Sequence, residues 1–200
     1  FQSPITIGSY TQSGGVTDLN GEPFTINGII NQTGGNIDAS TNSSISIGGA
    51  GAILTGLVFS PAPALFETFT LNRAGVTFNS TSLFQIGTLN LTAGTLTNPS
   101  ITIEDQGLIN VVAGVLTNAP TAVGVYVVSY ANTAALNTGN ELPTSPSTII
   151  RNLSKSAAGT LTLTQNIEIN GDLTLSGGTF AGGTNTISLD GNFVSNGAFT

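Results

Sequence analysis

The chain has 200 residues, a formal net charge of −7 and only 6% charged side chains, and it contains neither cysteine nor histidine. These values exclude a disulfide framework, zinc sites built from thiolate or imidazole, Ser-His-Asp and Cys-His catalysis, and the basic patch that binding of nucleic acid requires. With 39% hydrophobic residues the chain is too apolar for intrinsic disorder. Strong helix formers are scarce while Thr, Ser, Asn and Gly are abundant, which predicts an all-β fold.

A repeat of about twenty residues begins near the N-terminus. The stretch QSGGVTD, Gln12–Asp18, returns as QTGGNID at Gln32–Asp38. In the same way ITIG, Ile5–Gly8, returns as TING at Thr25–Gly28 and as ISIG at Ile45–Gly48. A period near twenty is too short for a propeller blade and matches one turn of a solenoid. We therefore predict a right-handed parallel β-solenoid with about 20 residues per coil.

Glycines recur at matching places in these repeats, often seven residues apart within one coil. Glycine adopts the positive φ of a tight corner without a steric penalty. The predicted structural corners are Gly8, Gly15, Gly28, Gly35, Gly48, Gly87, Gly94, Gly107, Gly114, Gly171, Gly178 and Gly191.

Between the corners apolar and polar residues alternate, which predicts strands with one face inside and one outside. On this pattern Ile7, Ile47, Ile86 and Ile103 are expected in one internal stack. The alternative fold is a β-sandwich of hairpins, because Asn-Gly pairs such as Asn20-Gly21 also favour hairpin turns.

The repeat divides the chain into three parts. Regular coils are expected over residues 1–119, an irregular coil or projecting loop over 120–147, and regular coils again over 148–200. The long apolar stretch Ile47–Phe66 raises the question of a membrane span. Its glycines and prolines argue against a spanning helix, so no membrane span is predicted.

Two stretches resemble a known group of proteins. They are IIRNLSKSAAGTLTLTQNIEINGDLTLSGGTFAGGTNTISLDGNFVSNGAFT, Ile149–Thr200, and YVVSYANTAALNTGNELPTSP, Tyr126–Pro146. Both are similar to the repetitive β-solenoid regions of large secreted surface proteins of Bacteroidota. The resemblance implies a structural or adhesive, fibre-forming role at the cell surface, an extracellular location, export by a type IX route and no catalytic motif. We therefore expect a protein that is not an enzyme and that binds surfaces or glycans without turnover.

Two other functions stay open. A polysaccharide-active β-helix enzyme would need a pair of carboxylates, since glycoside hydrolysis uses one acid and one base or nucleophile. The candidates are Glu104 with Asp105, and Glu168, Asp172 and Asp190 on consecutive coils. The other alternative is an ice- or surface-binding solenoid.

An ice-binding face would use regular outward rows of threonine. Thr160, Thr162 and Thr164, with Thr184 and Thr186, are the candidates for such rows. Outward threonine is also the commonest polar choice in a strand, which explains these residues without a ligand.

No cofactor is predicted, although a stack of two carboxylates raises calcium as a possibility. Asp18 and Asp38 are twenty residues apart and would lie about 5 Å apart in adjacent coils. A cation would relieve their repulsion. Solvated corner residues explain the pair as well.

Both ends of the chain resemble interior coils and carry no cap. The stretch FQSPITIGSY enters a repeat strand within five residues, and the last coil still carries the apolar residues Phe193, Val194 and Phe199. Open strand edges pair with other strands. We therefore expect identical subunits or further repeats of the same chain to stack head-to-tail on both ends.

Overall fold

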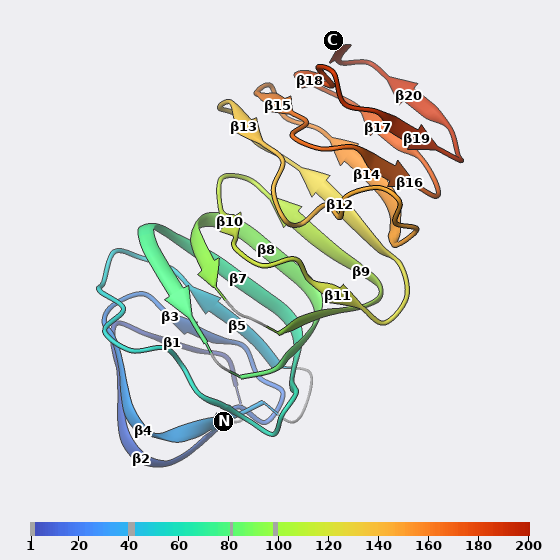
Figure 1. Ribbon diagram of the computed structural model, residues 1–200. Helices are drawn as coiled ribbons and strands as arrows, with labels where there is room; N and C mark the ends of the chain where they lie inside the picture. The colour runs from blue at the N-terminus through green and yellow to red at the C-terminus, as the bar shows by residue number, and fades with distance from the viewer. Residues whose placement is uncertain (1–2, 40–42, 81, 98–99) are drawn as a thin grey trace.

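The computed structural model describes residues 3–39, 43–80, 82–97 and 100–200, and within these residues it contains strands and no helix. The strands wind into a β-solenoid of about nine turns with roughly 20 residues per turn. Figure 1 shows the coils stacked along one axis, with the two ends of the chain at opposite ends of the stack. This confirms the parallel β-solenoid. In the part of the chain that is described, no helix suited to crossing a membrane is found.

The strands form one long sheet and three shorter ones. The main sheet contains β1 (Ile5–Ile7), β3 (Phe24–Ile26), β5 (Ser43–Ile47), β7 (Ala64–Asn79), β8 (Phe84–Thr97), β9 (Ile101–Val111), β12 (Tyr126–Tyr130), β14 (Ile150–Lys155), β17 (Leu173–Leu175) and β20 (Phe193–Ser195), with β10 (Val115–Leu116) and β11 (Thr121–Ala122) attached to β8 and β9. The side sheets contain β2 (Tyr10–Asp18), β4 (Ile30–Asp38) and β6 (Phe59–Ser60); β13 (Leu136–Asn137), β15 (Thr160–Thr162), β18 (Thr179–Ala181) and β21 (Ala198–Phe199); and β16 (Ile167–Ile169) and β19 (Ile187–Leu189).

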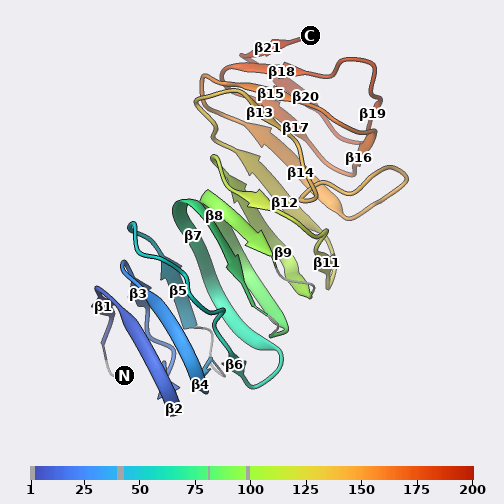
Figure 2. The same ribbon diagram turned by 60° about the vertical axis from the view of Figure 1, so that its left-hand side comes forward.

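Two inward columns continue through all the central strands of the main sheet, which run side by side in Figure 2. Outside these columns several strand pairs shift register, as β7 and β8 do after Leu71. One inward column consists of Ile5, Phe24, Ile45, Phe69, Leu89, Ile109, Val128, Leu153, Leu173 and Phe193. A second inward column, two residues further along each strand, consists of Ile7, Ile26, Ile47, Leu71, Leu91, Val111, Tyr130, Lys155, Leu175 and Ser195. The hydrophobic core is therefore a stack of equivalent side chains, because each strand pairs in parallel with its counterpart in the next coil.

All strand pairings among the described residues are parallel, so the hairpin sandwich is wrong. Asn20 and Gly21 do form a turn, with φ of 50° and 79°. The strands on either side of this turn belong to different sheets and pair with other coils instead of each other. The turn therefore changes the direction of the chain within a coil.

The prediction of a single isoleucine stack is wrong. Ile7 and Ile47 share the second inward column, whereas Ile86 pairs with Phe66 and with Ile103 in a different column. The physical reason is coil length, since 24 residues separate Ile47 from its counterpart Leu71. The extra residues shift the phase of all later repeats.

The predicted corners Gly48 and Gly87 also lie in different columns, because Gly48 follows Ile47, which pairs with Leu71, whereas Gly87 follows Ile86, which pairs with Phe66. A Cβ on Gly48 would meet Asn27, whereas a Cβ on Gly87 would meet the backbone oxygen of Glu67. A Cβ on Gly107 would meet the oxygen of Gly87, so these two glycines do stack.

The corner glycines are required for two different reasons. Only Gly15, Gly35, Gly94 and Gly178 among the predicted corners have positive φ. At Gly28, Gly171 and Gly191 an added Cβ would lie 1.7–2.4 Å from backbone atoms of the preceding coil. Close approach between coils therefore accounts for most of the corner glycines that positive φ does not explain.

The segment 120–147 is part of the stack. It supplies β12 to the main sheet and β13 to a side sheet. The coil from Tyr130 to its counterpart Lys155 is 25 residues long, about five more than the usual repeat. Part of the connection between β13 and β14 bulges from the side of the solenoid (Figure 2).

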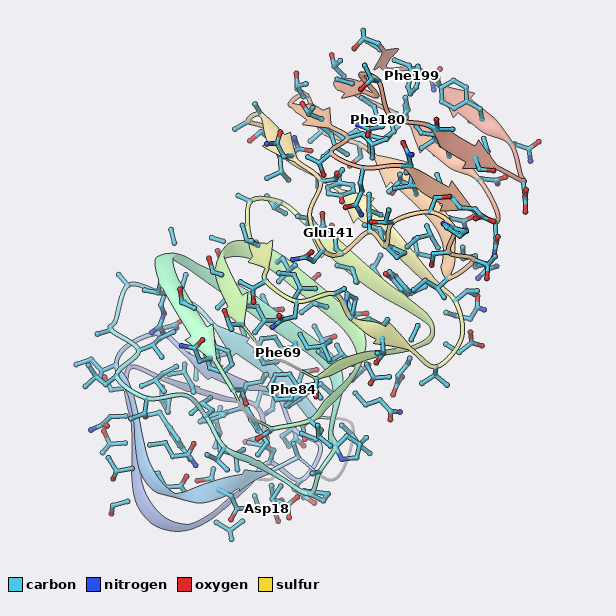
Figure 3. The ribbon with its side chains drawn as sticks, viewed as in Figure 1. Asp18, Phe69, Phe84, Glu141, Phe180 and Phe199 are labelled. Carbon is cyan, nitrogen blue, oxygen red and sulfur yellow. The ribbon has the colours of Figure 1, made fainter. Side chains whose placement is uncertain are left out.

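Several phenylalanines between residues 59 and 84 pack against one another in the core. The ring centroids of Phe59 and Phe66 lie 5.2 Å apart, and those of Phe69 and Phe84 lie 5.4 Å apart. Figure 3 shows Phe69 and Phe84 inside the coil. The Phe59 and Phe66 rings meet edge to face, with an angle of 86° between their planes, and this contact adds to the stabilisation from burial.

Gly34 and Gly14 occupy the same corner in adjacent coils and provide a matched pair. A Cβ on Gly34 would lie 2.5 Å from the oxygen of Ser13, whereas a Cβ on Gly14 would meet nothing within 4 Å. We expect Gly34→Ala to lower the free energy of unfolding by about 1–3 kcal/mol through steric overlap. We expect Gly14→Ala to change it by no more than about 0.5 kcal/mol. Urea unfolding of both variants measures the difference, and equal effects would contradict the close-approach explanation.

Candidate functional site

The carboxylates that suggested hydrolysis are engaged in contacts between coils. Glu104 accepts a hydrogen bond from the Gln85 side chain at 3.3 Å, and Asp105 accepts one from the backbone N–H of Val125 at 3.1 Å. Glu168 accepts a hydrogen bond from the backbone N–H of Ser147 at 3.3 Å. These contacts give each of the three side chains a structural role.

Asp172 belongs to a ladder of side chains that continues from coil to coil. Its backbone N–H donates to Asn152 Oδ1 at 2.8 Å, and its own Oδ1 accepts from the backbone N–H of Asn192 at 2.8 Å. Asn166 accepts from the N–H of Thr186 in the same way, again at 2.8 Å. This ladder could have been predicted, because Asn152, Asp172 and Asn192 recur every twenty residues in the sequence. Sequence reasoning missed it.

The structure does not gather the candidate acids around a cleft. Glu168 lies on β16 in a side sheet, Asp172 lies at the start of β17 in the main sheet, and Asp190 is exposed after β19. Two surface clefts, of about 280 and 530 Å³, are lined by residues around Phe84 and around Leu136. No carboxylate lines either of these two clefts.

Asp18 and Asp38 are neighbours in adjacent coils, as the repeat predicted. Asp18 Oδ1 accepts a hydrogen bond from the backbone N–H of Asn20 at 2.9 Å, and Ser60 follows Asp38 in the column. Within the described residues, no group of three or more acidic, histidine or cysteine side chains is placed to hold a metal ion. Calcium at this pair stays a prediction.

A nearly uniform row of polar side chains runs along the outside of the main sheet. We call it the outward stripe. It consists of Thr6, Thr25, Ser46, Thr70, Asn90, Asn110, Ser129, Ser154, Thr174 and Val194. The stripe contains no charged residue, and its members follow one another at the strand spacing of about 4.8 Å. It therefore presents a regular line of hydroxyl and amide groups to solvent.

Hydrogen bonds connect neighbouring members of the stripe at its centre. Asn110 Nδ2 donates to Asn90 Oδ1 at 3.4 Å, and Asn90 Nδ2 donates to Thr70 Oγ1 at 3.2 Å. These contacts hold the amides in one orientation, so the central part of the stripe is ordered before any ligand arrives.

The threonine rows proposed for ice do not extend over the stack. Thr160 pairs with Thr179 in the next coil, and Thr179 in turn pairs with Ala198. Thr162 pairs with Ala181. Thr164 instead makes a hydrogen bond to Thr138. A rank of threonine on every coil is therefore absent from this face of the described residues.

A polar cluster is buried inside the long coil and was missed by sequence reasoning. Glu141, which is 4% exposed, accepts hydrogen bonds from the Tyr130 hydroxyl at 2.5 Å and from the backbone N–H of Gly139 at 2.7 Å. Its backbone carbonyl accepts one from the Tyr126 hydroxyl at 2.9 Å. Figure 3 shows Glu141 near the middle of the stack of coils. The cluster holds the irregular segment against the core.

Two cations are buried against backbone carbonyls. Arg73 donates to the carbonyls of Gly48 and Ile26, at 2.6 and 3.1 Å, and Lys155 donates to the carbonyls of Ala157 and Asn132. Each side chain is 1% exposed. Lys155 lies two residues after Leu153 in the same strand. Because inward and outward residues alternate along a strand, the sequence already predicts that Lys155 points inward.

Burial changes the acid–base chemistry of these groups. It lowers the pKa of Lys155 below its ordinary value of 10.5, because the charged ammonium loses hydration. Burial also raises the pKa of Tyr130 well above 10.0, and the nearby Glu141 carboxylate raises it further. The pKa of Tyr126 is raised by the same two causes.

Comparisons with protein-family models, with curated proteins and with solved structures find no match for this chain.

Removal of the Glu141 carboxylate is expected to destabilise the long coil. In Glu141→Ala the buried Tyr130 hydroxyl loses its acceptor, and loss of a hydrogen bond to a charged group costs about 1.5–3 kcal/mol. Thermal unfolding followed by circular dichroism measures this loss. Glu104→Ala serves as the control, because its contact with Gln85 is only partly buried. A stability equal to that of the unchanged chain would refute the role of the cluster.

Stability is expected to rise with pH and then to fall. Because burial lowers the pKa of Lys155, the unfolded chain binds more protons as the pH approaches the ordinary lysine pKa of 10.5, so stability rises with pH up to about pH 10, by at most about 1.4 kcal/mol per pH unit. Above about pH 10 the raised pKa values of Tyr126 and Tyr130 reverse the slope, because only the unfolded tyrosines ionise there. Urea titrations at a series of pH values give this profile. Lys155→Met should remove the rising part and keep the fall.

Proposed function

We propose that this chain is a structural and adhesive segment of an extracellular surface protein that binds surfaces or glycans without turnover. The outward stripe is the observation that carries the proposal. A rigid row of hydroxyl and amide groups without charges suits a partner that repeats its own hydroxyl groups along a line, such as a neutral polysaccharide. Repeated weak contacts along the row would add up through multivalency.

The positions of the carboxylates support binding over hydrolysis. Glu104, Asp105, Glu168 and Asp172 accept hydrogen bonds that join neighbouring coils. A hydrolase needs two carboxylates facing each other across a scissile bond, at about 5–10 Å. Side chains already used as acceptors between coils are poorly placed for that task.

The low charge of the chain, the absence of cysteine and the resemblance to secreted solenoids of Bacteroidota support the extracellular location and type IX export. Labelling of intact cells of the source organism with an antibody against the folded chain tests the extracellular location.

The adhesive role predicts binding to insoluble neutral polysaccharides. In a pull-down with a panel that includes cellulose, chitin and insoluble α-glucan, the chain should sediment with at least one of them. A positive charge in the middle of the stripe, in Asn90→Lys, should weaken that binding about tenfold, which is about 1.4 kcal/mol. Val115→Lys is the matched control, since Val115 is exposed on β10 away from the stripe.

Two outcomes would contradict this function. One is a lack of binding to every member of the panel. The other is release of soluble sugar that disappears in Glu104→Gln or Asp172→Asn, because either loss would identify a hydrolase.

A further inference from the structure

Lys155 is a charged residue in a core column whose other members are uncharged. It lies in the second inward column, between Tyr130 of the preceding coil and Leu175 of the next one. Within the described residues, its ammonium has only the backbone carbonyls of Asn132 and Ala157 as hydrogen-bond partners. A cation that is 1% exposed and has no carboxylate beside it is costly to keep charged. The surroundings of Lys155 therefore favour the neutral amine, which is a nucleophile.

Asn132 carries the one buried side-chain atom of the described residues that has no hydrogen-bond partner. Its side chain is 1% exposed. The Nδ2 atom donates to the backbone carbonyls of Ala134 and Thr160, at 2.8 and 3.0 Å, whereas Oδ1 accepts from no group. These two bonds hold the carboxamide by its nitrogen and leave its carbonyl group free.

The two side chains meet at the same corner of adjacent coils. Tyr130 pairs with Lys155, so Asn132, two residues after Tyr130, lies beside the segment that follows Lys155. Gly159 N–H donates to the backbone oxygen of Asn132 at 3.1 Å, and Lys155 Nζ lies 3.5 Å from that same oxygen. The carboxamide carbon of Asn132, Cγ, is four bonds away from this oxygen. The amine and the carboxamide are therefore neighbours in a place that excludes bulk water.

We propose that Lys155 and Asn132 condense to form an isopeptide bond, which joins two adjacent coils covalently. After rotation of the flexible lysine stem, the lone pair of Nζ attacks Cγ of Asn132, and the bond between Cγ and Nδ2 breaks. Nδ2 leaves as ammonia with a proton from Nζ. Overall, an ammonium side chain and a carboxamide give a secondary amide and an ammonium ion, so atoms and charge balance without an oxidant or a further reactant.

Two features of the site favour this reaction. Burial lowers the pKa of Lys155 below its ordinary value of 10.5, which increases the fraction of neutral amine. The reaction also removes the buried charge, because the product is a neutral amide. The new amide keeps one N–H, which replaces the carboxamide as a donor to the carbonyl of Ala134 or Thr160.

The bond closes a loop around the irregular part of the chain. The segment between Asn132 and Lys155 contains β13 and the buried Glu141. A cross-link across this loop restricts the unfolded chain, as a disulfide does, and so stabilises the long coil. The inference depends on these two side chains and is independent of the adhesive role.

The experiment measures the mass of the chain and of its tryptic fragments. The folded 20.1 kDa chain, incubated at about pH 9 to increase the neutral amine, should lose about 17 Da, the mass of one ammonia. Trypsin cleaves the unreacted chain after Arg73, Arg151 and Lys155. In the reacted chain the site after Lys155 should resist cleavage, and residues 74–151 should stay attached to residues 152–200 in one fragment.

Two variants each remove one reactant. Lys155→Met and Asn132→Ala should keep their full mass under the same conditions. If either variant fails to fold, the unchanged chain in urea replaces it, because unfolding separates the two side chains and should prevent the cross-link between the two fragments.

Asn170→Ser is the matched control. Asn170 precedes Gly171, and an Asn-Gly pair also loses ammonia when it cyclises onto its own backbone. This variant should keep the loss of ammonia and the cross-linked fragment. A cyclised Asn-Gly pair opens again in mild base with the gain of one water, whereas the isopeptide bond persists.

Two results would overturn the proposal. One is an unchanged chain that keeps its full mass and is still cleaved after Lys155 when incubation is prolonged. The other is a loss of ammonia that remains in both Lys155→Met and Asn132→Ala. The pH dependence of stability gives a second readout, because the reacted chain should lack the rise that a titrating Lys155 causes, and a rise that persists in the cross-linked chain would also contradict the bond.

Discussion

The parallel hydrogen-bonded ladder between coils is the constraint on which the rest of this structure depends. It sets the distance between equivalent residues at about 4.8 Å, so each side chain has its counterpart from the next coil as its nearest partner. Columns of like residues follow from that distance. Apolar columns close the core, and the outward stripe forms because each central strand of the main sheet turns outward the residue that lies between the two inward columns.

The same distance explains the chemistry of the corners. Where two backbones approach most closely, as at Gly28 above Gly8, there is no room for a Cβ. Where the backbones lie slightly further apart, an Asn or Asp side chain fits and accepts an N–H from the next coil, as Asn152 and Asp172 do. Backbone groups that a corner leaves unpaired are costly when buried, and these side chains satisfy them. Among the acidic residues, Asp105, Glu168 and Asp172 accept backbone N–H groups from a neighbouring coil in this way.

The buried polar and charged residues Arg73 and Glu141 lie at the two coils that are longer than the twenty-residue repeat. The long coil that ends at Leu71 is followed by buried Arg73, and the one that ends at Lys155 encloses Glu141. Arg73 donates to the carbonyls of Gly48 and Ile26, and Glu141 accepts from the Tyr130 hydroxyl. Buried polar networks of this kind are stable only when nearly every member is satisfied. Asn132 Oδ1 is the exception within the described residues, because it is buried without a hydrogen-bond partner.

The sequence by itself determined the fold class, the period near twenty, the alternation of inward and outward residues and the pairing of Asp18 with Asp38. Each of these depends only on local spacing, which the ladder converts directly into contacts. The tertiary structure alone decided which distant repeats align, because the long coils that end at Leu71 and Lys155 shift the phase of everything after them. For that reason Ile47 and Ile86 lie in different columns. It also explains why most of the corner glycines are needed and what Asp172 contacts, because both depend on the backbone of a neighbouring coil that no local pattern describes. The contact of Glu141 with Tyr130 depends on how the long coil folds back on itself, which local spacing does not describe either.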